Sequence, residues 1–307
     1  MEMRQLVAKV LEEIMHKDER ICVLDADLSK ANGTAKFKDI FPDRAFNVGV
    51  AEQNMASVAA GMSSYGLIPF ITTFTPFASR RIADQLTISI AYAQQNVKII
   101  ATDPGITAEY NGGTHMSFED IGIVRSIPTM VIYEPVDNRQ LEQAIPQIVD
   151  HYGPVFVRMG RKVFPDVFDE NYKFDLFKAD VLKEGTDVTI FATGIMVTES
   201  LKAVKILEEQ GINVELINVH TIKPIDRKTV IESAMKTKRA VVCENHNIIG
   251  GLYSAISEVL SEEYPIYMKP IGIKDRFGQV GKVKDLIVDY EMTDQHIVKA
   301  VLEIMKK

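Results

Sequence analysis

Short apolar runs alternate with amphipathic stretches along nearly the whole chain, and this alternation constrains the fold more than any other feature. Strand-like runs occupy residues 21–24, 68–72 and 97–102, whereas apolar residues recur at helical spacing from Leu6 to Ile14. The pattern also predicts one helix at residues 79–95. Strands that alternate with helices are typical of α/β units built on a parallel sheet. We therefore predict an α/β fold with mostly parallel sheets.

The alternation is interrupted once, between residues 163 and 185. This segment holds Pro165 and several aromatic residues but shows no helical period, which indicates a packed interdomain linker. A second series of strands and helices follows it. A chain of 307 residues is long enough for two domains. We predict two three-layer α/β domains, at residues 1–162 and 186–307.

Composition and charge exclude several classes of protein. The net charge is -7, with 35 basic residues scattered among 42 acidic ones, so we expect no nucleic-acid partner. No apolar run reaches the roughly 18 residues of a membrane helix, and the charged start does not resemble a secretory signal. We expect a cytoplasmic protein that does not contact membranes. Cys22 and Cys243 lie far apart in apolar runs, and we expect both to be buried thiols.

Ligands of open α/β sheets bind at the carboxyl ends of the strands, so polar loops at these ends are the candidate sites. Four loops qualify, at residues 25–29, 49–54, 73–77 and 102–115. Glu52 begins a helix whose following turns are small and apolar, which predicts that its carboxylate is buried. It either stabilises the helix dipole or shares a proton with a ligand in an apolar pocket.

Aromatic and basic residues in these regions leave two interpretations open. Phe74 and Phe77 either pack in the core or form a stacking wall for a flat heteroaromatic ring. His115, in a long polar loop with three glycines, is either simply exposed or contacts a polar substrate. Arg158 and Arg161 close a strand, where each forms a surface ion pair or binds a phosphate or sulfonate.

Glu244 and His246 precede Gly250 and Gly251, a pattern that fits a phosphate-binding turn less well than helix packing. The spacing lacks the GxGxxG pattern of a dinucleotide site. The sequence also contains no Walker A, HExxH or GxSxG motif. These enzyme classes therefore lose their main support.

Several ordered motifs resemble the C-terminal half of transketolase. They are Asn-Val-Gly-Val-Ala-Glu-Gln-Asn at residues 47–54, Phe-Thr-Pro-Phe at 74–77 and Gly-Gly-Thr-His at 112–115. The likeness extends to Asp-Ala-Asp-Leu-Ser at 25–29, Glu-Asn-His at 244–246 and Asp-Arg-Phe-Gly at 275–278, so it covers nearly the whole chain. Motifs in matching order are more specific than any one of them alone.

The resemblance implies an enzyme that uses thiamine diphosphate to transfer a two-carbon ketol unit from a ketose to an aldehyde. Glu52 would hydrogen-bond the aminopyrimidine ring and promote its imino tautomer. Phe77 would stack on that ring, and Phe74 would complete the wall. Leu28 would lie beneath the bent cofactor, with Asp27 on the thiazolium side.

On the substrate side, the resemblance implies that His115 contacts substrate oxygens and that Arg161 and Arg4 bind a phosphate. The sequence also departs from the family pattern on this side. Asp103 stands where the family usually has histidine, and we expect its carboxylate to repel a nearby anion.

Two further departures lie at Tyr110 and Asn111, where the family has an acidic pair, and Ala31 stands where serine is common. We place Asn111 among the substrate-binding residues. Because all the departures fall on the substrate side, we predict that the substrates differ from the usual pentose phosphates. An unusual ketose phosphate or a sulfonated sugar would fit.

The family binds the diphosphate and Mg²⁺ through a Gly-Asp-Gly run, and this sequence contains none. The resemblance therefore implies the C-terminal subunit of a split transketolase. An N-terminal partner subunit would hold the diphosphate and Mg²⁺, in an α2β2 heterotetramer.

Two alternatives share the predicted fold. One is the β subunit of a 2-oxoacid dehydrogenase or a deoxyxylulose-phosphate synthase-like enzyme, although the phenylalanine pair and the Gly-Gly-Thr-His loop favour transketolase. The other is a non-catalytic regulatory subunit.

Overall fold

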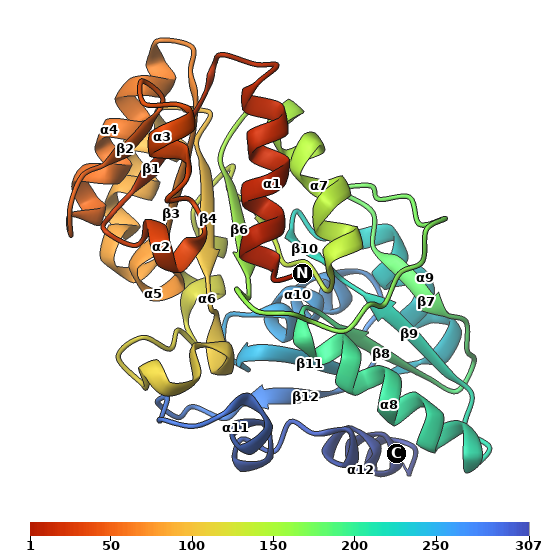
Figure 1. The fold of residues 1–307 in the computed structure, drawn as a ribbon. Helices are drawn as coiled ribbons and strands as arrows, with labels where there is room; N and C mark the ends of the chain where they lie inside the picture. The colour runs from red at the N-terminus through yellow and green to blue at the C-terminus, as the bar shows by residue number, and fades with distance from the viewer. Residues whose placement is uncertain (307) are drawn as a thin grey trace. The chain divides into compact units, whose positions relative to one another are not determined.

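The computed structural model describes residues 1–306 and divides the chain into two compact units, drawn in Figure 1. Unit 1 comprises Met1–Pro104 and Ile123–Leu176, and unit 2 comprises Gly105–Gly122 and the chain from Phe177 onward. Each unit contains a mostly parallel sheet with helices packed on it, which confirms the predicted fold class.

The six strands of unit 1 are parallel and lie in the order β5-β6-β4-β3-β1-β2. Their bounds are β1 (Ile21–Asp25), β2 (Ala45–Asn47), β3 (Ile68–Phe74), β4 (Lys98–Thr102), β5 (Val131–Tyr133) and β6 (Val155–Met159). Every residue of β1, β3, β4, β5 and β6 is buried. Continuous burial of this kind is typical of parallel strands that are covered on both faces.

Helices cover both faces of the unit 1 sheet. Helices α1 (Met3–Met15) and α7 (Asn138–Asp150) lie side by side over one face, and α4 (Glu52–Ser64) lies over the other (Figure 1). Shorter helices, α2 (Ser29–Asn32), α3 (Phe37–Ile40) and α5 (Thr75–Ala78), follow β1 and β3. The apolar face of α1 explains its position, because its buried residues recur at helical spacing.

The single helix predicted for residues 79–95 is wrong. The chain instead forms α5, a 3-10 turn at Arg80–Ile82 and a π-helix at Gln85–Tyr92. Ser79 leaves the helical region, and its hydroxyl bonds to the carbonyl of Thr75 at 2.7 Å. Such local side-chain bonds compete with regular helix formation, and the residues near this break belong to the site described below.

The sheet of unit 2 has the strand order β12-β11-β8-β9-β7. Its strands are β7 (Asp180–Lys183), β8 (Val188–Ala192), β9 (Val214–Asn218), β11 (Arg239–Asn247) and β12 (Tyr267–Ile273); β10 (Thr221–Lys223) is a further short strand. The edge strand β7 runs antiparallel to β9 and lies within the segment predicted as a linker. The remaining pairs are parallel.

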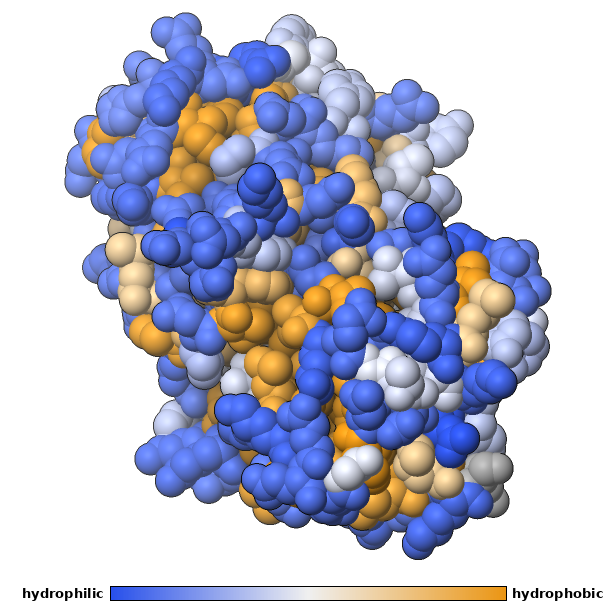
Figure 2. All heavy atoms as spheres, turned by 90° about the vertical axis from the view of Figure 1, so that its right-hand side faces the viewer, coloured by the Kyte–Doolittle hydropathy of each residue, from blue (hydrophilic) through white to orange (hydrophobic). Residues whose placement is uncertain are grey.

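The helices of unit 2 connect these strands or follow the last of them. They are α8 (Ile195–Glu209), α9 (Arg227–Thr237), α10 (Leu252–Glu263), α11 (Val283–Asp289) and α12 (Asp294–Ile304). The segment Gly105–Gly122 also folds with this unit and contains a 3-10 helix at Gly105–Asn111 and the start of α6 (Asp120–Arg125). Within residues 1–306, every helix is too short or too polar to span a bilayer. On the face drawn in Figure 2, hydrophilic residues surround smaller hydrophobic areas.

Burial tests the predictions for the two cysteines and for Arg158. Cys22 and Cys243 are both free and buried, as predicted, and burial raises the pKa of each thiol to about 12. Arg158 is completely buried and forms an ion pair with Glu134 at 2.5 Å. Arg158 therefore lies in the interior of unit 1. It neither forms a surface ion pair nor is placed to bind an anion.

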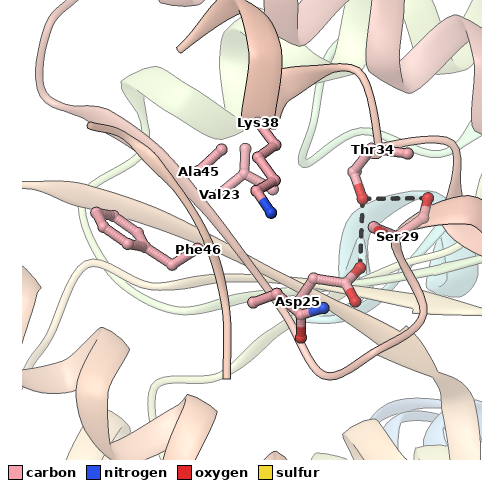
Figure 3. A pocket seen from close by; sticks show the side chains of 9 residues that line it. Val23, Asp25, Ser29, Thr34, Lys38, Ala45 and Phe46 are labelled. Carbon is pink, nitrogen blue, oxygen red and sulfur yellow. Dashed lines mark hydrogen bonds between the residues drawn. The ribbon is translucent and has the colours of Figure 1, made fainter. Parts of the chain in front are cut away.

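A pocket of about 300 Å³ lies beside the ends of β1 and β2 (Figure 3). Asp25, which is 3% exposed, borders it and accepts the backbone N–H of Leu28 at 2.5 Å and the hydroxyl of Thr34 at 3.3 Å. The side chain of Lys38 points into the same pocket. Asp25 therefore fixes the loop after β1, which carries the predicted cofactor residues Asp27 and Leu28.

Asp25 should make the stability of the chain depend on pH. Burial raises the pKa of its carboxyl from 3.8 to about 6, so the folded state binds the proton more tightly than the unfolded state does. Ionisation of Asp25 therefore lowers the free energy of unfolding as the pH rises from 4 to 6, by at most about 1.4 kcal/mol per pH unit. Asp25→Asn should remove this loss, because a carboxamide can still accept from Leu28 and donate to Thr34.

The test is urea unfolding of wild type and Asp25→Asn at pH 4, 5, 6 and 7, with the exposed Asp43→Asn as the control. The stability difference between wild type and Asp25→Asn should change across this range, whereas the control should follow wild type. A constant difference would contradict the assignment.

Candidate functional site

Glu52 is the first residue of α4 and is 3% exposed, which confirms its predicted burial. Nη1 of Arg81 lies 2.9 Å from each carboxylate oxygen. A buried carboxylate without a partner is strongly unfavourable, and this contact provides the opposite charge. The sequence did not point to Arg81. Helical spacing from Phe77 offers no signal, because the chain leaves the helical conformation at Ser79, between the two residues.

The two candidate aromatic residues form a pair at the end of β3. The ring centroids of Phe74 and Phe77 are 6.1 Å apart, with the rings tilted by 37°. The Cζ atom of Arg81 lies 3.9 Å from the Phe77 centroid, and that of Arg161 lies 4.7 Å from the Phe74 centroid. Both rings therefore carry a guanidinium on one face, an arrangement that cation–π attraction stabilises. Phe74 and Phe77 therefore do more than pack in the core.

Asp103 is the second buried carboxylate of this group. It follows β4 with a φ of 54° and is 4% exposed. Its Oδ2 accepts from Nε and Nη2 of Arg161, at 2.6 and 2.5 Å, and its Oδ1 accepts the backbone N–H of the same residue at 3.1 Å. Burial raises the pKa of Asp103, and the neighbouring guanidinium opposes this rise.

This pairing adds a partner that the sequence did not predict. Asp103 was expected to repel a nearby anion, and the structure shows that its charge is also matched by that of Arg161. The register of the sheet explains the contact. Thr102 of β4 pairs with Met159 of β6, so the residues just beyond these two strand ends meet. Nη1 of Arg161 is not engaged by Asp103, and the side chain is 18% exposed.

Six side chains thus form one continuous group, which we call the arginine–phenylalanine array. Its members, in spatial order, are Glu52, Arg81, Phe77, Phe74, Arg161 and Asp103. All six belong to unit 1 and lie at the ends of its parallel strands or in the segments that follow them. The array offers two flat cations, two aromatic faces and two buried acceptors, which suits a flat, polar heterocycle and an anion.

The loop after β1 places the remaining predicted cofactor residues. Asp27 is exposed, has a φ of 62° and donates its backbone N–H to Oδ1 of Asn47 at 3.1 Å. Leu28 is half-buried and is tied to Asp25 through its own N–H. Asn47 also accepts the N–H of Gly49 at 2.9 Å, so one amide links this loop to the segment that leads to Glu52.

The backbone of Arg4 is bonded to that of Arg161: the Arg4 N–H donates to the Arg161 carbonyl at 3.3 Å. Its guanidinium, however, binds Glu2 at 2.7 Å and the carbonyl of Ala31 at 2.9 Å. Arg4 therefore supports the loop that contains Ala31. Its predicted role as a second anion ligand requires these bonds to break.

The other predicted substrate residues belong to unit 2. Tyr110 and Asn111 are exposed on the 3-10 helix, and His115 is half-buried, with Nδ1 2.9 Å from the hydroxyl of Thr114. The motif at residues 244–247 holds this segment in place. The side-chain Oδ1 of Asn245 accepts the N–H of Ile106 at 3.0 Å.

Glu244 gives the paired glycines a structural role, as the helix-packing interpretation predicted. Its carboxylate accepts the N–H groups of Leu252 and Tyr253, at 2.7 and 3.0 Å, and so caps α10. A Cβ on Gly251 would lie 1.9 Å from the same carboxylate, which explains the glycine. The carboxylate takes the position at which a helix N-terminus would bind a phosphate. Residues 1–306 contain no group of three or more His, Cys, Asp or Glu side chains that could hold a metal ion.

Comparisons with known proteins agree with this geometry. The family described as "Transketolase, pyrimidine binding domain" matches residues 1–166, and "Transketolase, C-terminal domain" matches residues 177–297. A "6-deoxy-6-sulfo-D-fructose transketolase subunit SqwH" from Clostridium sp. (strain MSTE9) is 50% identical, over 99% of this chain and 95% of its own length. A "Putative transketolase C-terminal section" from Methanocaldococcus jannaschii is 42% identical, over 99% of this chain and 96% of its own.

Among solved structures, one described as "Split gene transketolase, inactive beta4 tetramer" superposes with a TM-score of 0.90. It is 40% identical and the match covers 100% of this chain and 98% of that one. Both halves of the sequence therefore match the same family, in the same order and over nearly their full length. The chain belongs to the transketolase family.

Proposed function

We propose that the chain is the C-terminal subunit of a split transketolase that moves a two-carbon ketol unit from an anionic ketose to an aldehyde. Membership of the family implies thiamine diphosphate as the cofactor. The observation that carries the proposal is that one flat guanidinium, that of Arg81, contacts both the buried Glu52 carboxylate and the face of Phe77. We place the enzyme in the cytoplasm.

The residues of unit 1 fit the pyrimidine half of this cofactor. A flat, delocalised cation already lies against both Glu52 and Phe77, so the space between them accepts a planar nitrogen-containing group. Glu52 and Phe77 would hold the ring, Phe74 would extend the wall, and Asp27 and Leu28 would lie below it. When bound, thiamine diphosphate supplies the nucleophilic carbon for ketol transfer.

The chain's own side chains would then control protons and water. The Glu52 carboxylate would hold a proton at the ring nitrogen of the pyrimidine, and its burial makes that hydrogen bond strong. The aromatic wall would exclude water from one side of the cofactor. The imidazole of His115 would donate a hydrogen bond to substrate oxygens, and Asn111 would contribute a further polar contact.

The diphosphate and Mg²⁺ are assigned to an N-terminal partner subunit, because this sequence has no Gly-Asp-Gly run. The similarity to a split-gene transketolase supports this division of the site. That solved relative is described as an inactive β4 tetramer, and we likewise expect this chain to be inactive alone. With its partner we propose an α2β2 heterotetramer.

Glu52→Gln should lower kcat of the reconstituted enzyme by roughly 100-fold or more, because the amide cannot exchange a proton with the pyrimidine. The amide keeps the shape of the side chain, so the thermal midpoint of the cofactor-free chain should change little by comparison. Ketol transfer in the presence of the N-terminal subunit is the measurement. The exposed Glu13→Gln variant is the matched control. Unchanged activity in Glu52→Gln would support the regulatory-subunit alternative instead.

The charges of Arg161 and Asp103, at one end of the arginine–phenylalanine array, suggest which donor sugar the enzyme uses. Arg161 already shares its charge with Asp103, so the pair leaves less than one full positive charge for a substrate. A sulfonate carries one negative charge, whereas a phosphate monoester carries nearly two at neutral pH. A monoanion is therefore the better match. The relative from Clostridium is named for 6-deoxy-6-sulfo-D-fructose, and we propose a sulfonated ketose of this kind as the donor.

Asp103→Asn should change this preference toward phosphates. Loss of the competing carboxylate should raise kcat/KM for xylulose 5-phosphate relative to 6-deoxy-6-sulfofructose by about fivefold, equivalent to about 1 kcal/mol. The measurement is initial rates with both donors and a common acceptor, with Asp43→Asn as the control for a surface charge change. An unchanged ratio would contradict the role given to Asp103.

Activity assays of the wild-type enzyme also distinguish the proposed function from its alternatives. Equal or better turnover of xylulose 5-phosphate with ribose 5-phosphate would overturn the sulfonated donor. Release of CO2 from pyruvate in place of ketol transfer would place the chain with the 2-oxoacid enzymes or deoxyxylulose-phosphate synthases.

A further inference from the structure

Arg81 occupies the two contacts that the proposed function gives to the aminopyrimidine ring. Its Nη1 lies 2.9 Å from both oxygens of Glu52, and its Cζ lies 3.9 Å from the centroid of Phe77. We propose that Arg81 is a placeholder for the cofactor. Its guanidinium takes the pyrimidine position in the cofactor-free chain and leaves this position when the ring binds. This inference rests on the proposed thiamine diphosphate site.

The chemistry of the two groups makes the exchange possible. A guanidinium and a 4-aminopyrimidine are both flat, delocalised units with nitrogen bonded to a shared carbon. Each can present an N–H to a carboxylate and a face to an aromatic ring. A ring that is stacked on this face of Phe77 and bonded to Glu52 would overlap the guanidinium. The two groups therefore compete for one position.

The burial of the partners shows which of them moves. The side chain of Glu52 is 4% exposed and that of Arg81 is 43% exposed. Moving the guanidinium into water costs little, because it is already partly hydrated, whereas the carboxylate has no path to water. Arg81 is thus the mobile member, and the incoming ring takes over its role as partner of Glu52.

Arg161 provides an internal contrast within the same array. It also stacks on a phenylalanine and pairs with a buried carboxylate, but it is only 18% exposed. Both its side chain and its backbone N–H bind Asp103. Arg81 has no such backbone bond to Glu52 among the contacts of the described residues. Arg161 is therefore held by both its backbone and its side chain, whereas Arg81 is held only by its guanidinium.

The placeholder has two effects of opposite sign. In the empty chain it stabilises the fold, because it neutralises a carboxylate that is removed from water. During loading it opposes the cofactor, because its contacts must first be broken. An Arg81→Leu variant should therefore be less stable when empty and bind the cofactor more tightly.

The deciding experiment is calorimetric titration of thiamine diphosphate, with Mg²⁺ present, into the complex of this chain with its N-terminal partner. Arg81→Leu should lower Kd by about fivefold, which is about 1 kcal/mol. Arg44→Leu is the matched control, because Arg44 stacks on Phe41 at 4.7 Å in the same unit and has no contact with Glu52. Its Kd should equal that of wild type. Arg81→Lys keeps the charge without the flat shape and should fall between wild type and Arg81→Leu.

A second readout needs neither partner nor cofactor. The thermal midpoint of the full chain alone should fall in Arg81→Leu and recover in the double variant Glu52→Gln with Arg81→Leu, because the neutral amide no longer needs a cation. Weaker or unchanged cofactor binding by Arg81→Leu would overturn the placeholder and leave the proposed function intact. Binding by neither the wild-type complex nor the variant would overturn the proposed function, and the placeholder with it.

Discussion

The pairing of buried carboxylates with arginines determines how the site of unit 1 is built. Glu52 and Asp103 are both buried in unit 1, and an isolated ionised carboxylate in such surroundings is strongly unfavourable. Each is matched by a guanidinium from a distant part of the chain. Because a guanidinium is flat and only weakly hydrated, its free face can also cover an aromatic ring. The positions of Phe74 and Phe77 therefore follow from the same requirement.

The parallel sheet supplies the geometry for these pairs. Phe74 pairs with Thr102 across β3 and β4, and Thr102 pairs with Met159 across β4 and β6. Three neighbouring strands therefore end at one level. Residues that follow them meet although they are tens of positions apart in the sequence, which is the general reason that α/β enzymes bind ligands at this edge. The arginine–phenylalanine array is a consequence of register as much as of residue choice.

The sequence predicted what depends on local pattern and missed what depends on pairing across the sheet. The alternation of apolar runs was enough for the α/β class, and the small residues after Glu52 were enough for its burial. Arg158 and Arg161 looked equivalent, because only the structure shows that one is enclosed beside Glu134. The partner of Asp103 was missed for the same reason, since it lies 58 residues away.

The helix expected at residues 79–95 was also misjudged, because hydroxyl-to-backbone bonds interrupt a pattern that is otherwise helical. Arg81 lies in that irregular stretch. Helical periodicity describes regular elements and gives no signal where a functional residue depends on a break in one.

The segment that carries Tyr110, Asn111 and His115 is held by Asn245 and folds with unit 2, whereas Glu52 and Phe77 fold with unit 1. Effects of substitutions in groups without shared partners tend to add independently. Mutations in the unit 2 segment can therefore leave the packing around Glu52 intact. This separation gives evolution two segments that can change independently: a lineage can accumulate substitutions in one without disturbing the fold of the other.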